Sequence, residues 1–319
     1  MKLIISSRAL SILYSFLVKY KEAGNYTLLL PSNIYHDVFF LINYLEISYI
    51  FIDIDEDDLC INKEIVIEFI TRNRRLILIY NHTFGIPAVP YAFFREIKNI
   101  SSEVVIIDDR CLCAPIMETK SDDSCIDLIL YSTGYAKQVD LSGWGFGFVD
   151  DLFCMNRNQI TFEKQKYLEL KNSFFENALN YFPDKHKISE CIQVSDDIDV
   201  DPFYYERLIS EDVEKWYEHK STITEIYKSS IPDEVQLPSE MNNWRFNIMV
   251  KNRDRIFKEL FRNNLFASAH YASIGTMLNR QDYRTADQLH QNIINLFVDK
   301  YYTQEKAEKT VAIIIKNLS

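Results

Sequence analysis

The chain has 319 residues, of which 47% are hydrophobic and 25% charged, a composition typical of globular proteins with one or two domains. Its net charge of -11 argues against a nucleic-acid partner, because phosphate-backbone binding needs clustered Lys and Arg. The six cysteines include no CxxC pair, so we interpret them as reduced, predict no metal site and expect a cytoplasmic protein. The sequence predicts neither a signal peptide nor a membrane span.

The first half alternates short apolar runs with helical patterns. Runs that are apolar on both faces predict buried strands at 26–31, 48–55, 75–82, 103–109, 127–133 and 145–150. Helical spacing is found between them, for example at 33–46 and 89–100. This alternation predicts an α/β fold with a mainly parallel sheet between helices. Ligands bind at the carboxyl ends of such strands, where the sequence places His82, Asp108, Asp109 and Ser132.

The second half predicts a smaller α+β unit. Residues 153–184 are polar with helical spacing, and strands are expected at 188–194, 243–250 and 265–273, with a helix at 253–264. A last helix over 303–318 has Thr303 placed to cap it and Glu305 in its first turn. We expect a large domain over 1–184 and a small C-terminal domain over 185–319.

The stretch LILYSTGYAKQVDLSGWGFGFVD, residues 128–150, places Lys137 before three of the chain's seven glycines. With other segments it resembles the sugar aminotransferases of the DegT/DnrJ/EryC1 family, which are pyridoxal-phosphate (PLP) enzymes of fold type I. SSRALSILYSFL is similar to the family's GTAALxLALxAL, YNHTFGIPA to VHLYGQPA, VVIIDDRCLCAP to VIEDAAQAHGA, and the stretch around Lys137 to SFxxxKNLxxxGDGGAIV. The resemblance covers most of residues 1–150 and returns from 244 to 319.

The resemblance implies a role for each matching residue. Lys137 corresponds to the Schiff-base lysine, which also carries protons. Asp109 corresponds to the carboxylate that keeps the pyridine nitrogen protonated, and Tyr35 to the aromatic partner of the ring. The implied phosphate ligands are a helix start with Ser6, Ser7 and Ser132, supported by Arg8. Weaker substrate contacts are implied for His82, His270 and Tyr271.

Each of these residues also has an ordinary structural interpretation. Ser6 and Ser7 could cap a helix, Tyr35 could be core, and His82 and His270 could be hydrogen-bonded structural histidines. Without the family pattern, Lys137 would be interpreted as a solvated lysine and Asp109 as a turn residue.

Several positions depart from the family pattern. Leu112 stands where the family has Gln or His against the ring oxygen, and a leucine cannot form that hydrogen bond. Trp144 and Phe146 replace an acid and a glycine of the GDGG element. We find no counterpart of the NYRM segment that reaches the neighbouring subunit's cofactor.

The resemblance implies an aminotransferase that transfers an amino group from glutamate to a keto sugar linked to a nucleotide, in lipopolysaccharide or other surface polysaccharide synthesis. It also implies a homodimer. Lysine at position 137 disfavours the related sugar dehydratases, which have histidine there. Two alternatives stay open: a degenerate member that acts as a binding or partner subunit, and a PLP enzyme that acts on amino acids.

Overall fold

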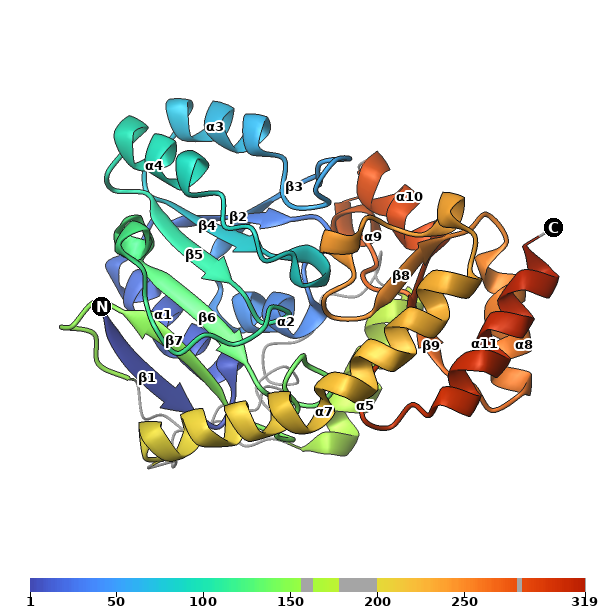
Figure 1. Cartoon of the computed structure of the whole chain (residues 1–319). Coiled ribbons are helices and arrows are strands. Elements are labelled where there is room, and N and C mark those ends of the chain that lie inside the picture. Colours follow the sequence, from blue (N-terminus) through green and yellow to red (C-terminus); the bar gives the residue numbers. More distant parts are fainter. Residues whose placement is uncertain (156–162, 178–199, 280–282, 319) are drawn as a thin grey trace.

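The computed structural model describes residues 1–155, 163–177, 200–279 and 283–318, which form two sheets with helices around them (Figure 1). The large sheet has the strand order β1-β7-β6-β5-β4-β2-β3. Its strands are β1 (Lys2–Ser6), β2 (Thr27–Pro31), β3 (Ser48–Ile52), β4 (Leu76–Asn81), β5 (Val105–Asp109), β6 (Leu128–Ser132) and β7 (Gly145–Val149). Strands β2 to β6 are parallel to their neighbours in this group, whereas β7 is antiparallel to both β6 and β1. The predicted mainly parallel sheet is confirmed.

The large sheet is buried on both faces. Leu29, Leu78 and Ile107, in the middle of three strands, are each 0% exposed, as expected when helices cover both faces. The helices of this half are α1 (Ala9–Ala23), α2 (His36–Leu45), α3 (Lys63–Arg72), α4 (Tyr91–Ile100) and α5 (Lys164–Asn177). Helix α1 packs against α2, and α3 packs against α4.

The second sheet is small and antiparallel, with the order β8-β10-β9. It consists of β8 (Phe246–Met249), β9 (Ala267–Ser268) and β10 (Ile293–Leu296), with the helices α8 (Arg253–Arg262), α9 (Ile274–Asn279), α10 (Arg284–Asn292) and α11 (Gln304–Asn317). The predicted cap of the last helix is confirmed, since Thr303 Oγ1 accepts a hydrogen bond from Lys306 N at 3.3 Å.

Helix α7 (Pro202–Ser230) runs from the large sheet to the small one (Figure 1). Near its start, the Tyr205 ring lies 5.9 Å from the ring of Phe146 on β7. Near its end, the Tyr227 ring lies 5.5 Å from the ring of Phe246 on β8. The expected domain boundary near residue 185 and the strand expected at 188–194 lie outside the described residues.

Two strands were not predicted. β1 is an edge strand at the chain start, paired only with β7, and no turn signal precedes it. β10 begins at Ile293, directly after α10 ends at Asn292, so no turn residue marks it. Among the described helices, none combines the length and the apolar character that crossing a membrane requires.

Candidate active site

A cavity of about 790 Å³ lies at the carboxyl ends of β4, β5 and β6 and reaches residues of the second half of the chain. The predicted site residues that line it are Ser7, Tyr35, His82, Asp109, Ser132, Lys137, His270 and Tyr271. Ser6 is not part of the lining. It is 2% exposed and pairs with Gly145 between β1 and β7. The topology thus brings together side chains that are up to 264 positions apart, Ser7 and Tyr271 being the extremes.

Lys137 lies in the connection between β6 and β7, in a tight turn. Its backbone N–H donates to Gly134 O at 3.2 Å. The carboxylate of Asp140 accepts from the N–H groups of Ala136 at 3.1 Å and Ser142 at 2.9 Å, which closes the turn from inside. Both of these residues have positive φ, 58° for Ala136 and 61° for Ser142. The turn therefore has a specific, partly strained backbone conformation that its hydrogen bonds maintain.

Two residues that flank the strands of the small sheet also donate hydrogen bonds to this turn. Trp244, two residues before β8, donates from Nε1 to Ala136 O at 2.6 Å. Lys300 donates from Nζ to Asp140 O at 2.7 Å. Since Ala136 directly precedes Lys137, the position of the lysine depends on contacts with both halves of the chain.

The glycines after Lys137 have different roles. At Gly145, a Cβ atom would lie 2.4 Å from Ala9 N, so only glycine allows β7 to pass this close to the start of α1. At Gly143, a Cβ atom would meet nothing within 4 Å. The close approach that requires glycine at position 145 is thus to the backbone of α1.

The start of α1 forms another wall of the cavity. Ser7 and Arg8 precede the helix and line the cavity, and Arg8 at the N-cap position makes no side-chain capping hydrogen bond. Ser132 lies two strands from Ser6, since both pair with Gly145, and its Oγ accepts from Gly134 N at 3.3 Å. A helix start carries partial positive charge, so this wall suits an anion.

Asp108 and Asp109 are consecutive on β5 and therefore point to opposite sides of the sheet. Asp109 lines the cavity, and its Oδ1 accepts from Cys111 N at 3.0 Å. Asp108 is 0% exposed and accepts from His82 Nε2 and from Arg110 Nε, both at 2.7 Å. Burial opposes ionisation of Asp108, but His82 and Arg110 outweigh it and lower its pKa.

His82 is a structural part of this network. Its Nε2 faces the Asp108 carboxylate, and its Nδ1 lies 2.7 Å from the carbonyl oxygen of Ile86. Both partners are acceptors, so both ring nitrogens donate and the ring is positively charged. Although burial opposes this charge, Asp108 raises the pKa of His82 well above its usual value. With both nitrogens in use, the geometry favours the structural interpretation of His82 over substrate contact.

The second half of the chain contributes an aromatic and cationic wall. The Tyr271 and Tyr35 rings lie 5.8 Å apart, and the His270 and Trp244 rings 5.3 Å apart. Burial, together with the charge of Arg245, lowers the pKa of His270 well below its usual value, so this imidazole is neutral. Sequence reasoning missed Trp244 and Arg245, because the run that contains them was interpreted only as a strand.

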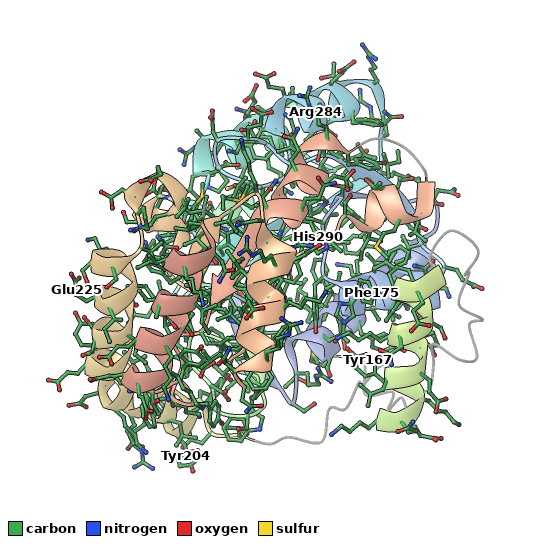
Figure 2. All side chains as sticks on the ribbon, turned by 90° about the vertical axis from the view of Figure 1, so that its right-hand side faces the viewer. Tyr167, Phe175, Tyr204, Glu225, Arg284 and His290 are labelled. Atoms are coloured by element: carbon green, nitrogen blue, oxygen red, sulfur yellow. The ribbon has the colours of Figure 1, made fainter. Side chains whose placement is uncertain are left out.

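Sequence reasoning also missed the wall supplied by α2 and α5. Tyr167 on α5 donates to Asp37 Oδ1 at 2.8 Å, and both residues line the cavity. Figure 2 shows α5 with Tyr167 and Phe175 labelled, and the ring of Phe175 lies 5.4 Å from that of His36 on α2. The helical spacing within residues 153–184 predicts a helix there but not that Tyr167 reaches the cavity.

No protein-family model matches the chain, and neither does any curated protein sequence. Solved structures do match. A DegT DnrJ EryC1 StrS aminotransferase from Brucella abortus has a TM-score of 0.66 and 14% identity over 100% of this chain and 86% of its own. DesV from S. venezuelae, solved in complex with a ketimine intermediate, has a TM-score of 0.67 and 12% identity over 98% of this chain and 84% of its own.

A third match is a protein from Streptococcus pneumoniae that was solved in a PLP form. It has a TM-score of 0.67 and 14% identity over 100% of this chain and 88% of its own. Identities this low establish the fold. The chain has the fold of the DegT/DnrJ/EryC1 aminotransferases, and the resemblance stated from the sequence is confirmed at that level.

Proposed function

We propose that the chain is a PLP-dependent aminotransferase that aminates a keto sugar linked to a nucleotide. The observation that carries this proposal is that Lys137, Asp109 and Ser132 line one cavity at the carboxyl ends of adjacent strands. In the family resemblance, Lys137 corresponds to the Schiff-base lysine, Asp109 to the carboxylate for the ring nitrogen and Ser132 to a phosphate ligand. The Streptococcus pneumoniae protein with the same fold was solved both in a PLP form and in a pyridoxamine-phosphate (PMP) form.

The chemistry of the side chains fits the cofactor. PLP has an anionic phosphate, a basic pyridine nitrogen and a carbonyl carbon. The cavity offers hydroxyl groups and the start of α1 for the phosphate, the Asp109 carboxylate for the ring nitrogen, and the Lys137 amine for the carbonyl. In addition, the side-chain oxygen of Asn81, in the wall of the same cavity, is buried without a hydrogen-bond partner among the described residues. When bound, PLP supplies an electron sink for the carbon that exchanges the amino group.

The chain's own residues would position this chemistry. The braced turn holds the Lys137 amine at the cavity, where it can carry a proton between the cofactor and the substrate carbon. The Cys111 N–H holds the Asp109 carboxylate, which would keep the ring nitrogen of the cofactor protonated. Tyr35, 5.8 Å from Tyr271, offers an aromatic face for the ring.

The proposal extends to features that rest on the resemblance alone. Glutamate is the proposed amino donor, surface polysaccharide or glycan synthesis the proposed pathway, and a cytoplasmic homodimer the proposed form. We also propose that residues 1–184 form the cofactor domain and residues 185–319 the small domain.

Leu112 favours a second candidate function. Its apolar side chain lines the cavity where the family pattern has a hydrogen-bonding residue. A chain that has lost cofactor binding could serve as a partner subunit of an active homologue.

The test is an absorbance spectrum of the purified protein with added PLP, before and after glutamate. A visible band that disappears when glutamate is added would support the aminotransferase. Lys137→Ala should remove the band, whereas Lys164→Ala, which alters another lysine of the cavity lining, should keep it. A protein that stays colourless with PLP would refute the proposal and favour the partner subunit.

A further inference from the structure

Helix α7 contacts the turn that carries Lys137, residues 134–142, which we call the lysine turn. Lys220, in the second half of α7, donates a hydrogen bond from Nζ to the backbone carbonyl of Gln138, the residue directly after Lys137. Lys220 and Gln138 are 82 positions apart, so the fold and not the local sequence creates this contact. Lys220 is not among the residues that line the cavity. It therefore contacts the turn from outside the candidate active site.

Lys220 is one of three side chains that donate to alternate carbonyl groups of the lysine turn. Trp244 donates to the carbonyl two positions before Gln138, and Lys300 to the carbonyl two positions after it. These two donors flank strands of the small sheet, whereas Lys220 comes from α7. Lys137 therefore lies between two carbonyl groups that distant side chains hold in place.

A cluster of charges surrounds the Lys220 ammonium group. Burial lowers the pKa of Lys220, as does the charge of Lys300, whereas three nearby carboxylates raise it, those of Asp212, Asp299 and Asp140. These carboxylates favour the charged form of Lys220, and a charged donor makes a stronger hydrogen bond than a neutral one. Asp212 on α7 also accepts from the backbone N–H of Asp140 at 3.4 Å. Helix α7 thus holds the lysine turn with one donor and one acceptor.

We propose that Lys220 is a positioning residue, which fixes the place of the Lys137 amine through the carbonyl of Gln138. The catalytic part of this inference rests on the proposed function. A reactive group that is misplaced by about 1 Å can lose about 100-fold in rate, so a lysine on a turn needs its backbone held. Lys220 acts through the backbone of the turn and touches neither cofactor nor substrate. The position of Lys137 then depends on α7 as well as on the small sheet.

Hydrogen exchange of the full-length protein without added cofactor, followed by mass spectrometry of peptides, tests the hold on the turn. We expect K220M to speed exchange in peptides covering 134–142 about 10- to 100-fold, the effect typical of a lost hydrogen bond from a charged group, and to leave peptides from β5 unchanged. In a fluorescence titration, K220M should also weaken PLP binding about 10-fold or more. K220R keeps the charge and the donor and should restore most of both. K228M is the matched control, since Lys228 is exposed on the same helix.

The outcomes separate the two proposals. Unchanged exchange of the lysine turn in K220M overturns the role of Lys220, and so does an equal acceleration in β5, which would be a general loss of stability. Faster exchange of the turn with unchanged PLP affinity overturns it as well. If K220M does not fold, K220Q takes its place, because glutamine is neutral and one atom shorter, and unchanged exchange is then the refuting result. Failure of the proposed function is seen separately, as the absence of a visible band when PLP is added to the unmodified protein, and the exchange experiment still decides whether Lys220 holds the turn.

Discussion

The network around Asp108 predicts a large and pH-dependent loss of stability on Asp108→Asn. The carboxylate is 0% exposed and joins two cations, His82 at 2.7 Å and Arg110 at 2.7 Å. An asparagine amide is neutral and has one acceptor oxygen, so the charge of the carboxylate is lost to both cations; Arg110 keeps its pair with Asp123 at 3.1 Å, and the loss falls mainly on His82. Breaking a buried ion pair by removing one partner costs about 3–5 kcal/mol, the loss that we expect near pH 6.5.

The sign of the pH dependence follows from His82. Its pKa in the folded protein is raised well above 6.5, so its contribution is fully present below about pH 6.5 and is lost as the pH rises through the folded pKa. For one proton, the free energy of unfolding should fall by about 1.4 kcal/mol per pH unit above pH 6.5. In D108N the carboxylate is absent and burial dominates. The pKa of His82 then falls below 6.5, and this slope should disappear.

Denaturant unfolding at several pH values between about 6 and 8.5 measures both effects. The matched control is Asp122→Asn, because Asp122 is 56% exposed and pairs with Arg95 on the surface. It should change stability by less than about 1 kcal/mol. The reasoning is refuted if D108N loses less than about 1 kcal/mol, or if it retains the slope of the unmodified protein above pH 6.5.

Three further substitutions, two of them with a matched control variant, test the candidate site. Lys137→Ala should abolish the visible band of the PLP-treated protein, as measured by absorbance, without a change in thermal unfolding, whereas Lys164→Ala should retain the band. Gly145→Ala should lower stability by about 1–3 kcal/mol, because the new methyl group would overlap the backbone at the start of α1. Gly143→Ala, which meets no neighbour, should change denaturant unfolding little. Trp244→Phe should remove the hydrogen bond to the lysine turn, cost about 1 kcal/mol and weaken PLP binding in a fluorescence titration; unchanged affinity would show that the turn needs no brace.

The strands of the large sheet other than β1 could be predicted, because burial on both faces makes the sequence of a strand apolar at successive positions. The strand predicted at 127–133, for example, contains β6 and is one residue longer at each end. β10 has the same apolar character, but it starts where a helix ends, and no turn residue separates the two. Local signals thus identify strands where turns bound them and fail where elements join directly.

The candidate site shows the same division. Asp109 and Ser132 could be placed at one sheet edge because both end predicted parallel strands. The hydrogen bond from Trp244 to the lysine turn could not be predicted, because Trp244 is 108 residues from Ala136 and no local sequence pattern connects the two residues. Arg245 was equally hidden, because an arginine is expected at the surface and its burial depends on the distant ring of Phe297.

Helix α7 fixes the distance between its contact with the large sheet and its contact with the small sheet. Its two aromatic anchors, Tyr205 and Tyr227, are 22 positions apart, which corresponds to about 33 Å and, at about 100° per residue, to nearly the same face of the helix. An insertion or deletion of one residue between them would rotate one anchor by about 100° relative to the other. The number of residues in α7 therefore sets the distance and the relative orientation of the two sheets. Because residues from both halves of the chain line the cavity, this number also affects the shape of the cavity.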